Sequence, residues 1–427
     1  MMRDLHILIP RHYDFTSSHQ SSMWLESILP ELSTFFSIKI TWFYYSPKKI
    51  KTPILKDHEN IVQIQDYKNA VEVIQKIKPD LIFDSEFPTL IDLSFLAASR
   101  NNSFYVRKFS SHKMFKVPLK LHSTLSRLNS NIPIDDKKKK SVKRRNFYFY
   151  KYSFFLKSLF LSNLSFFEKL NYLIISIKWN LITESPFINS KIQTDMELLN
   201  SITLKETLIK KGYDDSKLIV TGNPMFDKFF NKRNEVEQNL EGKIRILFAP
   251  FQHYGEDHKD FQKKITLDII KLILTEKDNF SLTIKLHPSY HDFNYFKKLI
   301  TSIDNSIQIF QEGSIENYLD KSDILISNGQ VASSAIYGLI QKKPVIFCDF
   351  YNLYSYEEFD HVIFDCKDKN TFLKLLKDSN KLNKNNSKFI ENFLEKNYFK
   401  TDGMSSKRVA KAIQSIMGKI NSTTRFS

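Results

Sequence analysis

The sequence is poor in glycine and cysteine, and these scarcities bear on several classes of site. Only 9 of the 427 residues are glycine, and they form neither a G-x-G-x-x-G pattern nor a Walker loop. The dinucleotide-binding and P-loop classes therefore lose most of their support. The two cysteines, Cys348 and Cys366, stand in separate apolar runs without metal-site spacing. We expect buried free thiols in a reducing compartment, and neither a metal nor a cofactor.

Long hydrophobic runs are also missing. No stretch of about 20 apolar residues is free of charge, so no transmembrane helix is expected. The apolar run Leu5–Pro10 is too short for a signal peptide and has the length of a strand. These absences lead us to expect a cytoplasmic protein.

The chain has ample length and an ordinary apolar content. Its 427 residues, 42% of them hydrophobic, suit two domains of roughly 200 residues each. The formal net charge is +16, with the excess concentrated between about residues 137 and 180. A basic protein can bind nucleic acid, anionic lipid or phosphorylated substrates, so composition alone does not identify the function.

In the first half, short apolar runs alternate with amphipathic segments, which indicates parallel strands covered by helices on both faces. The predicted strands are Leu5–Pro10, Ile38–Tyr44, Ile61–Gln65, Leu81–Asp84, Phe104–Val106, Leu181–Thr183 and Lys217–Thr221. The predicted helices are 18–34, 68–78, 88–100 and 194–211.

Residues 231–243 are polar and charged and resemble an interdomain linker. A second α/β series follows, with predicted strands Ile244–Ala249, Leu282–Leu286, Ile307–Phe310, Ile324–Ser327, Val345–Cys348 and Val362–Phe364. Its predicted helices are 258–275, 291–303, 330–341, 369–379 and 405–417. We therefore predict an α/β protein of two Rossmann-like, doubly wound domains facing a cleft. The first spans 1–230, with a basic aromatic insert at about 109–179, and the second spans 244–427.

Ligands of doubly wound sheets bind beyond the carboxyl ends of the strands, so the polar residues after each strand are the candidates. In the first domain, Arg11 is a candidate phosphate or carboxylate ligand, and the bland alternative is a solvated loop. Asp84 and Glu86 are a candidate acid/base pair at the cleft. The same two acids would equally suit the start of a helix.

Three loops of the second domain are also candidates. His253 follows the first strand of that domain and could act as a general acid or phosphate ligand. His287 follows an apolar strand and precedes Pro288, which fixes how the histidine is presented. The third loop runs from a strand into a helix start, where exposed amides form an anion site unless they are merely capped. Its candidate ligands are Asn328, Gly329, Ser333 and Ser334.

Four motifs together resemble the GT-B superfamily, in particular the non-hydrolysing UDP-N-acetylglucosamine 2-epimerases and the CDP-glycerol glycerophosphotransferase and capsule polysaccharide transferases. They are Val220–Asp227, similar to a V-T-G-N-P/T-x-x-D turn; Lys285–Pro288, similar to K-x-H-P; Ser333-Ser334 followed by Lys343–Ile346, similar to S-S/T…K-P-V-I; and Asp402–Val409, similar to D-G-x-A-S-x-R. The resemblance covers residues 180–420. It implies a nucleotide-linked donor held by the second domain, with Ser289 and Asn223 among the binding residues.

The sequence departs from these families at three places. Tyr337 stands where an acidic residue usually binds the ribose or polyol of the donor. The G-T-R-P-E loop of the epimerases is missing, with Pro10-Arg11-His12 in a similar place. The histidine-glycine loop of the glycerophosphotransferases has no match in the first domain. The donor base therefore stays open between UDP- and CDP-linked compounds.

The segment 137–179 joins a lysine and arginine run to an aromatic-rich stretch. Such a segment could lie in an anionic membrane interface at the inner membrane face. Its aromatic side chains could instead pack on the first domain with the lysines solvated. A nucleic-acid partner is not expected, because no recognised binding motif accompanies the basic run.

The leading hypothesis is a glycosyl- or polyol-phosphate transferase of surface polysaccharide or glycolipid synthesis, acting on a glycan or lipid-linked acceptor. In it, His287 and His253 neutralise charge on the leaving phosphate, and Asp84 or Glu86 is the general base. One alternative is a nucleotide-sugar epimerase, which needs several cleft carboxylates. A second is a non-catalytic, membrane-associated scaffold of GT-B shape.

Overall fold

The computed structural model describes residues 2–11, 20–45, 56–84, 89–100, 103–109, 135–178, 190–232, 242–250, 259–287, 292–328, 333–350, 359–378, 382 and 387–423. The chain divides into two compact units. The first comprises Met1–Met225, Asn397–Lys400 and Met404–Ser427, and the second Phe226–Lys396 and Thr401–Gly403. None of the helices in the described ranges combines the length and apolar character needed to cross a membrane.

The first unit is built on a seven-stranded sheet in the order β3-β2-β1-β4-β5-β6-β7. All neighbouring pairs are parallel. The strands are β1 (Arg3–Arg11), β2 (Phe36–Tyr44), β3 (Glu59–Gln63), β4 (Leu81–Asp84), β5 (Phe104–Phe109), β6 (Met196–Leu199) and β7 (Leu218–Val220). Strands β2 and β3 are added on one side of β1, and β4 to β7 are added on its other side. This change between β1 and β4 is the switch point expected of a doubly wound fold.

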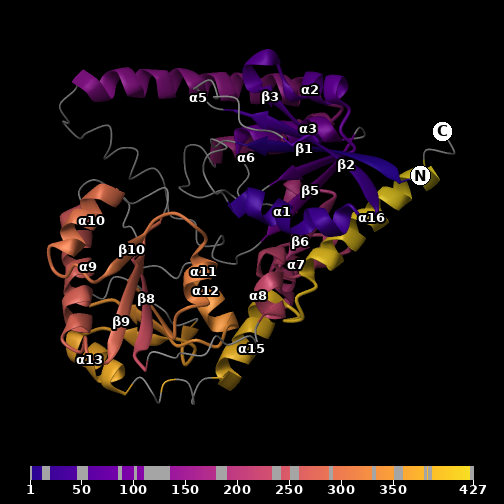
Figure 1. Cartoon of the computed structure of the whole chain (residues 1–427). Coiled ribbons are helices and arrows are strands. Elements are labelled where there is room, and N and C mark those ends of the chain that lie inside the picture. The colour runs from indigo at the N-terminus through magenta and orange to yellow at the C-terminus, as the bar shows by residue number, and fades with distance from the viewer. Residues whose placement is uncertain are drawn as a thin grey trace. The chain divides into compact units, whose positions relative to one another are not determined.

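Helices cover both faces of this sheet (Figure 1). On one face α2 (Ala70–Ile77), α3 (Leu90–Ser99), α5 (Asp135–Leu161) and α6 (Phe166–Ile177) share a core with the sheet. On the other face α1 (Gln20–Leu32) and the C-terminal α16 (Ser405–Thr423) pack against each other and the sheet. Helix α7 (Ile202–Lys210) lies between β6 and β7 in the chain.

The second unit has a six-stranded parallel sheet in the order β10-β9-β8-β11-β12-β13. Its strands are β8 (Ile244–Pro250), β9 (Phe280–Lys285), β10 (Gln308–Phe310), β11 (Ile324–Asn328), β12 (Val345–Cys348) and β13 (Phe364–Cys366). Its helices are α8 (Asp227–Asn231), α9 (Lys259–Leu274), α10 (Phe293–Thr301), α11 (Ile315–Leu319), α12 (Ser333–Ile340), α13 (Lys369–Lys377) and α15 (Ser387–Tyr398). The core includes buried side chains of α9, α10 and α13.

The predicted α/β class with two parallel, doubly wound sheets is confirmed. Three local predictions were wrong. Residues 196–199 form β6 within the predicted helix 194–211, and the helix itself begins at Ile202. The last strand is Phe364–Cys366 and not Val362–Phe364, and the helices α11 and α15 were not predicted. The predicted strand Leu181–Thr183 and most of the predicted linker 231–243 lie outside the described residues.

The C-terminal segment differs from the predicted division of the chain. Residues 404–427 were assigned to the second domain, but the structure places them in the first unit. The reason is apolar burial. Val409, Ala410, Ile413 and Met417 are fully buried against the α1 face of the first sheet.

Candidate functional site

Two predicted site residues lie at the carboxyl edge of the second sheet. In the order β9-β8-β11, His287 follows β9 by two residues and Asn328 ends β11. Because carboxyl ends of parallel strands meet at one edge, both residues lie at the edge where the neighbouring β8 also ends. His287 is exposed and Asn328 is buried. The β8 loop with His253, and also Ser289 and Gly329, lie outside the described residues.

The segment that carries His287 is fixed by a buried lysine. The Lys285 ammonium donates to the carbonyl oxygens of Leu286 at 3.0 Å and Gln311 at 2.7 Å. The Gln311 side-chain amide in turn donates to the carbonyl oxygen of His287 at 3.2 Å. Burial lowers the pKa of Lys285. The lysine of the K-x-H-P motif thus holds the backbone on either side of the motif, while the side chain of His287 is exposed.

Strand β11 delivers the start of α12 to the same edge. The Ser327 hydroxyl donates to the carbonyl oxygen of Ala249 in β8 at 2.9 Å, and α12 begins at Ser333, five residues after β11 ends. Ser334 is buried in the first turn of the helix. The first amides of a helix have no intrahelical acceptors and favour an anion. Phosphate oxygens are therefore the ligands that this helix start suits.

The lysine of the K-P-V-I motif does not lie at this edge. Lys343 precedes β12, and its ammonium donates to the carbonyl oxygens of Leu319 and, at 2.6 Å, of Ser322. These carbonyls belong to the end of α11 and the residues before β11, at the amino ends of the strands. Lys343 therefore stabilises the connection between α11 and β11, at the edge of the sheet opposite the carboxyl ends of the strands.

Tyr337 is likewise used in packing. Its ring stacks on Phe229 with centroids 4.1 Å apart and meets Phe226 edge-on at 5.3 Å. The side chain is buried, so it joins α12 to the turn and short helix that open the second unit. The tyrosine that replaces the acidic residue of the related families is thus a core residue of this chain.

Two of the motifs contact each other in the first unit. The Arg408 guanidinium donates to the carbonyl oxygen of Thr221 at 2.8 Å and to the Ser405 hydroxyl at 3.2 Å. Asn223, predicted as a binding residue, is buried, and its side-chain oxygen accepts from the amide of Met225 at 3.2 Å. The contacts given by the structure assign Asn223 to the turn after β7.

The predicted residues of the first unit do not form one site. Arg11 ends β1 and Asp84 ends the neighbouring β4. Register pairs Leu8 with Ile82, and side chains alternate between the two faces of a sheet. Arg11 therefore lies on the α1 face and Asp84 on the α3 face. Glu86 lies outside the described residues.

Asp84 belongs to a buried row of charges across three strands. Register places Asp84, Arg107 and Glu197 side by side on β4, β5 and β6, and all three are at most 2% exposed. Arg107 Nε lies 3.2 Å from Asp84 Oδ2, and Glu197 Oε1 accepts from the amide of Thr194 at 2.9 Å. Helix α3 adds Asp92, which caps its own helix with Thr89.

One guanidinium cannot balance all these carboxyl groups in a dry interior. Burial raises the pKa of Asp84 against the opposing charge of Arg107. Burial also raises the pKa of Asp92, helped by the charge of Asp84, and that of Glu197 to about 7. A buried, paired Asp84 is better placed to stabilise the sheet than to accept a proton from a substrate.

Sequence reasoning missed two tryptophan–cation pairs on the α1 face. The Arg11 guanidinium lies over the Trp42 ring at 5.0 Å and the Lys108 ammonium over the Trp24 ring at 5.6 Å. Trp24 also stacks on Phe83 with centroids 4.9 Å apart. A cation over a ring face gains electrostatic attraction. The Lys108 pair was missed because the predicted strand ended at Val106, whereas β5 continues to Phe109.

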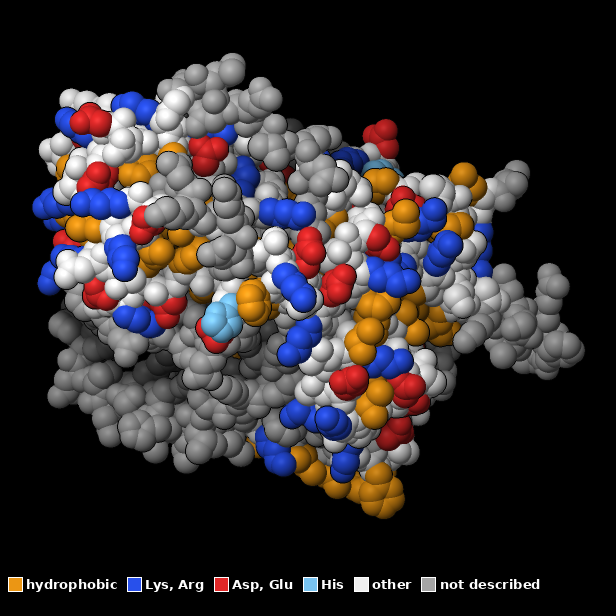
Figure 2. Space-filling model, turned by 90° about the horizontal axis from the view of Figure 1, so that it is seen from below, with side chains coloured by type: hydrophobic (Ala, Val, Ile, Leu, Met, Phe, Trp, Pro, Cys, Tyr) orange, Lys and Arg blue, Asp and Glu red, His pale blue; other side chains and the backbone are white. Residues whose placement is uncertain are grey.

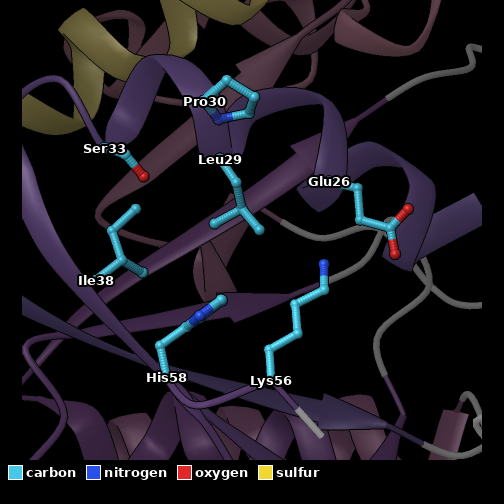
Figure 3. A pocket seen from close by; sticks show the side chains of 7 residues that line it. All are labelled: Glu26, Leu29, Pro30, Ser33, Ile38, Lys56 and His58. Atoms are coloured by element: carbon cyan, nitrogen blue, oxygen red, sulfur yellow. The ribbon is translucent and has the colours of Figure 1, made fainter. Parts of the chain in front are cut away.

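One pocket of about 430 Å³ is found in the described part of the chain, and it lies elsewhere. Its lining comes from α1, from the start of β2 and from the segment before β3 (Figure 3). Ile38 near the start of β2 and His58 just before β3 mark the amino ends of these strands. Substrates of such sheets bind at the opposite edge, so this pocket does not belong to the candidate site.

A family model describes much of this sequence. The model for CDP-glycerol:poly(glycerophosphate) glycerophosphotransferases matches residues 193–415, just over half of the chain. The chain belongs to this family. It is a transferase of surface polysaccharide synthesis that uses a nucleotide-activated donor, as the motifs predicted. The matched residues include both His287 and the β11–α12 connection.

Solved structures show the same fold at low sequence identity. A putative UDP-N-acetylglucosamine 2-epimerase from Listeria monocytogenes matches with a TM-score of 0.57 and 12% identity, covering 97% of each chain. The wall teichoic acid polymerase TagF, in a structure soaked with CDPG, matches with a TM-score of 0.54 and 14% identity, covering 97% of this chain and 89% of that one. These likenesses confirm the GT-B fold. No curated protein matches the sequence significantly.

Proposed function

We propose that this member of the glycerophosphotransferase family transfers a glycerophosphate or similar polyol-phosphate group from a CDP-linked donor to a growing cell-surface polymer. The observation that carries the proposal is the family match across residues 193–415, because it includes both segments that reach the carboxyl edge of the second sheet. A relative of the same fold, TagF, has been solved after a soak with CDPG, which supports a CDP-linked donor over a UDP-linked one.

The chemistry follows from the two segments. An acceptor hydroxyl oxygen bonds to the β-phosphorus, the bond from that phosphorus to the bridging oxygen breaks, and CMP leaves with the electron pair. The amides at the start of α12 bind the phosphate oxygens. His287, held by the Lys285 and Gln311 contacts, stabilises the charge that develops on the leaving phosphate. The hydroxyl proton passes to a base that the proposal does not assign.

The epimerase alternative has less support. It needs carboxylates that can reach a sugar carbon, and Asp84 is instead buried against Arg107. The glycan or lipid-linked acceptor, and work at the inner face of a membrane, remain parts of the proposal for the transferase.

Thermal unfolding with CDP, CMP, UDP and GDP tests the donor. A nucleotide at about 100 times its dissociation constant should add about 2.7 kcal/mol of stability. We expect CDP to raise the melting temperature of the wild type, and Ser334→Ala to weaken that effect. Ser322→Ala is the matched control. Ser322 is also buried, but it precedes the amino end of β11, whereas α12 follows the carboxyl end. The Ser322→Ala variant should therefore leave the nucleotide effect unchanged.

Turnover of CDP-glycerol with a polyglycerophosphate acceptor tests His287. The variant His287→Asn should lose about 100-fold or more in kcat while melting as the wild type does. The exposed His361 of the second unit, changed to Asn, should keep full turnover. In the thermal unfolding experiment, stabilisation by UDP but not by CDP would show that the donor is UDP-linked. Stabilisation by none of the nucleotides would refute the proposal.

A further inference from the structure

Tyr318 of α11 fixes the turn that follows β10. Its hydroxyl donates to the carbonyl oxygen of Glu312 at 3.1 Å, and its ring packs on Phe310 with centroids 4.9 Å apart. Phe310 is the last residue of β10, and Glu312 lies two residues further along the chain. One side chain therefore holds the backbone on both sides of Gln311.

The same ring lies over the ammonium of Lys285, 5.8 Å from the ring centroid. A cation within about 6 Å of a ring face gains electrostatic attraction, and gains more of it where water is excluded. This ammonium is the group that donates to the carbonyl oxygens of Leu286 and Gln311. Tyr318 thus helps to keep a buried cation in the place from which it binds the backbone next to His287.

These contacts converge on the backbone of His287. Its carbonyl oxygen accepts from the side-chain amide of Gln311, and the backbone amide of the preceding Leu286 donates to the carbonyl oxygen of Phe310 at 2.7 Å. The imidazole itself is exposed. Since the conformations open to a side chain depend on its backbone, the position of the imidazole depends on residues that do not touch a substrate.

The other end of α11 contacts α12 through different groups. The Asp320 carboxylate accepts from the side-chain amide of Gln341 at 2.7 Å, and carbonyl oxygens at and after the end of α11 accept from Lys343. Gln341 directly follows α12, whose first turn is the candidate anion site. Because these contacts do not involve the side chain of Tyr318, its removal should leave α12 and the anion site in place.

We propose that Tyr318 is a positioning residue for His287, and that it acts by holding Lys285 and the backbone of residues 310–312. This role rests on the proposed function, since it belongs to the same transfer site. A misplacement of about 1 Å can cost about 100-fold in rate, so a residue that never touches the substrate can still determine turnover. Tyr318 is thus required by the reaction and not only by the fold.

A double-mutant cycle on the turnover of CDP-glycerol tests this role. In the wild-type background, Tyr318→Leu should lower kcat by about tenfold and leave the KM for the donor within about twofold. In the His287→Asn background, the same change should lower kcat by less than about twofold, because the group that it positions is already gone. A merely structural tyrosine would give equal losses in both backgrounds, and that result would overturn the proposal.

The variant Tyr318→Phe separates the ring from the hydroxyl. It keeps a ring over Lys285 and removes the contact with the Glu312 carbonyl oxygen, so kcat should fall by only about two- to fivefold. It also keeps the role testable if Tyr318→Leu does not fold. The same cycle is measured with it, and equal losses in the two backgrounds would again contradict the positioning role.

Nuclear magnetic resonance gives a readout that needs no turnover. In protein labelled with 13C in its histidine rings, the His287 signal is the one that His287→Asn removes. Tyr318→Leu should move that signal and leave the signal of His361, in the same unit, in place. An unmoved His287 signal would overturn the positioning role, whether or not the wild type uses CDP-glycerol. A moved signal in a chain whose wild type shows no turnover would refute the proposed function alone.

The matched control is another tyrosine of the second unit that contacts a neighbouring aromatic ring. Tyr295 of α10 meets Phe296 edge-on, and Tyr295→Leu should keep the wild-type kcat. Both substitutions exchange neutral side chains, so neither alters the mixture of Lys, Arg, Asp and Glu side chains that Figure 2 shows on one face of the molecule. A lower kcat of Tyr318→Leu would then not come from weaker electrostatic attraction of an anionic substrate. An equal loss in Tyr295→Leu would overturn the proposal.

Discussion

Asp84 and Lys285 show that the role of a side chain cannot be inferred from its residue type and sequence position alone. Asp84 follows a predicted strand at a carboxyl edge and was a reasonable candidate for a general base. The structure pairs it with Arg107 in the interior, and sequence periodicity gave no sign that β5 would place an arginine beside it. The Lys285 contacts are the opposite case: the motif identified the residue, but only the fold shows that its ammonium binds carbonyl oxygens.

The buried carboxyl groups predict a pH-dependent stability. The pKa of Glu197 is raised by burial from 4.5 to about 7 in the folded chain, so the folded state binds more protons than the unfolded state between these values. The free energy of unfolding must then fall as pH rises through this window. The variant Glu197→Gln should reduce the fall between about pH 5 and about pH 8 by on the order of 1–3 kcal/mol.

Urea unfolding at both pH values checks this prediction. The exposed Glu206 of α7, changed to Gln, serves as the control and should keep the wild-type dependence. A Glu197→Gln variant whose pH dependence equals that of the wild type would show that Glu197 is ionised throughout.

At the scale of elements, the motifs act as contacts between segments far apart in the sequence. The turn after β7 and the start of α16 meet through Thr221, Ser405 and Arg408. Gly222 has a φ of +81°, and a Cβ atom there would lie 2.5 Å from the Ser405 hydroxyl oxygen and 3.1 Å from the Tyr398 carbonyl oxygen. The glycine is thus required by both its backbone conformation and the approach of α16.

Gly222→Ala should destabilise the first unit by about 2 kcal/mol or more. Gly212 of the same unit has a similar φ of +84°, and the nearest atom to its Cβ position, the Ser190 hydroxyl oxygen, is 3.5 Å away, so Gly212→Ala should cost only about 1 kcal/mol. Tryptophan fluorescence in urea follows the first unit, because all three tryptophans lie within Met1–Met225. Adding Ser405→Ala to Gly222→Ala should recover part of the loss, and equal losses for the two glycines would contradict the close contact.

Strands such as β4 and β12, whose bounds match the prediction, were predictable because each is a short and nearly unbroken apolar run between polar segments. Strand β6 was not predicted as a strand. Met196–Leu199 is followed after two residues by α7, and the two segments together have the apolar content of a single helix. At the candidate site, strand order brings His287 and Asn328 to one edge as predicted. The role of Tyr337 could not be read from the sequence, since its aromatic partners Phe226 and Phe229 precede it by about a hundred residues.

At the scale of the whole molecule, the chain leaves the first unit after Met225 and returns to it at the end. Removal of residues 404–427 should therefore unfold the first unit, because α16 buries Val409 and Ile413 against the α1 face. We expect a red-shifted tryptophan emission. The thiols of Cys348 and Cys366, buried in the second unit, should stay protected from an aromatic disulfide reagent.

The control truncation ends the chain after Gly418. It keeps Met417, the last described core residue of α16, and should leave both signals unchanged. Thiols that become reactive together with the tryptophan shift would show that the two units unfold as one.

The path of the chain also decides what a protease can release. Because the second unit is inserted between two parts of the first, a single cut at 233–241 would leave the units covalently joined through the return at Asn397. Neither fragment of such a nicked protein would be a complete folding unit, and both would stay associated through the core that α16 completes. A stable second unit can be produced only by a second cut before Asn397, or by a gene that begins near Phe226 and stops there.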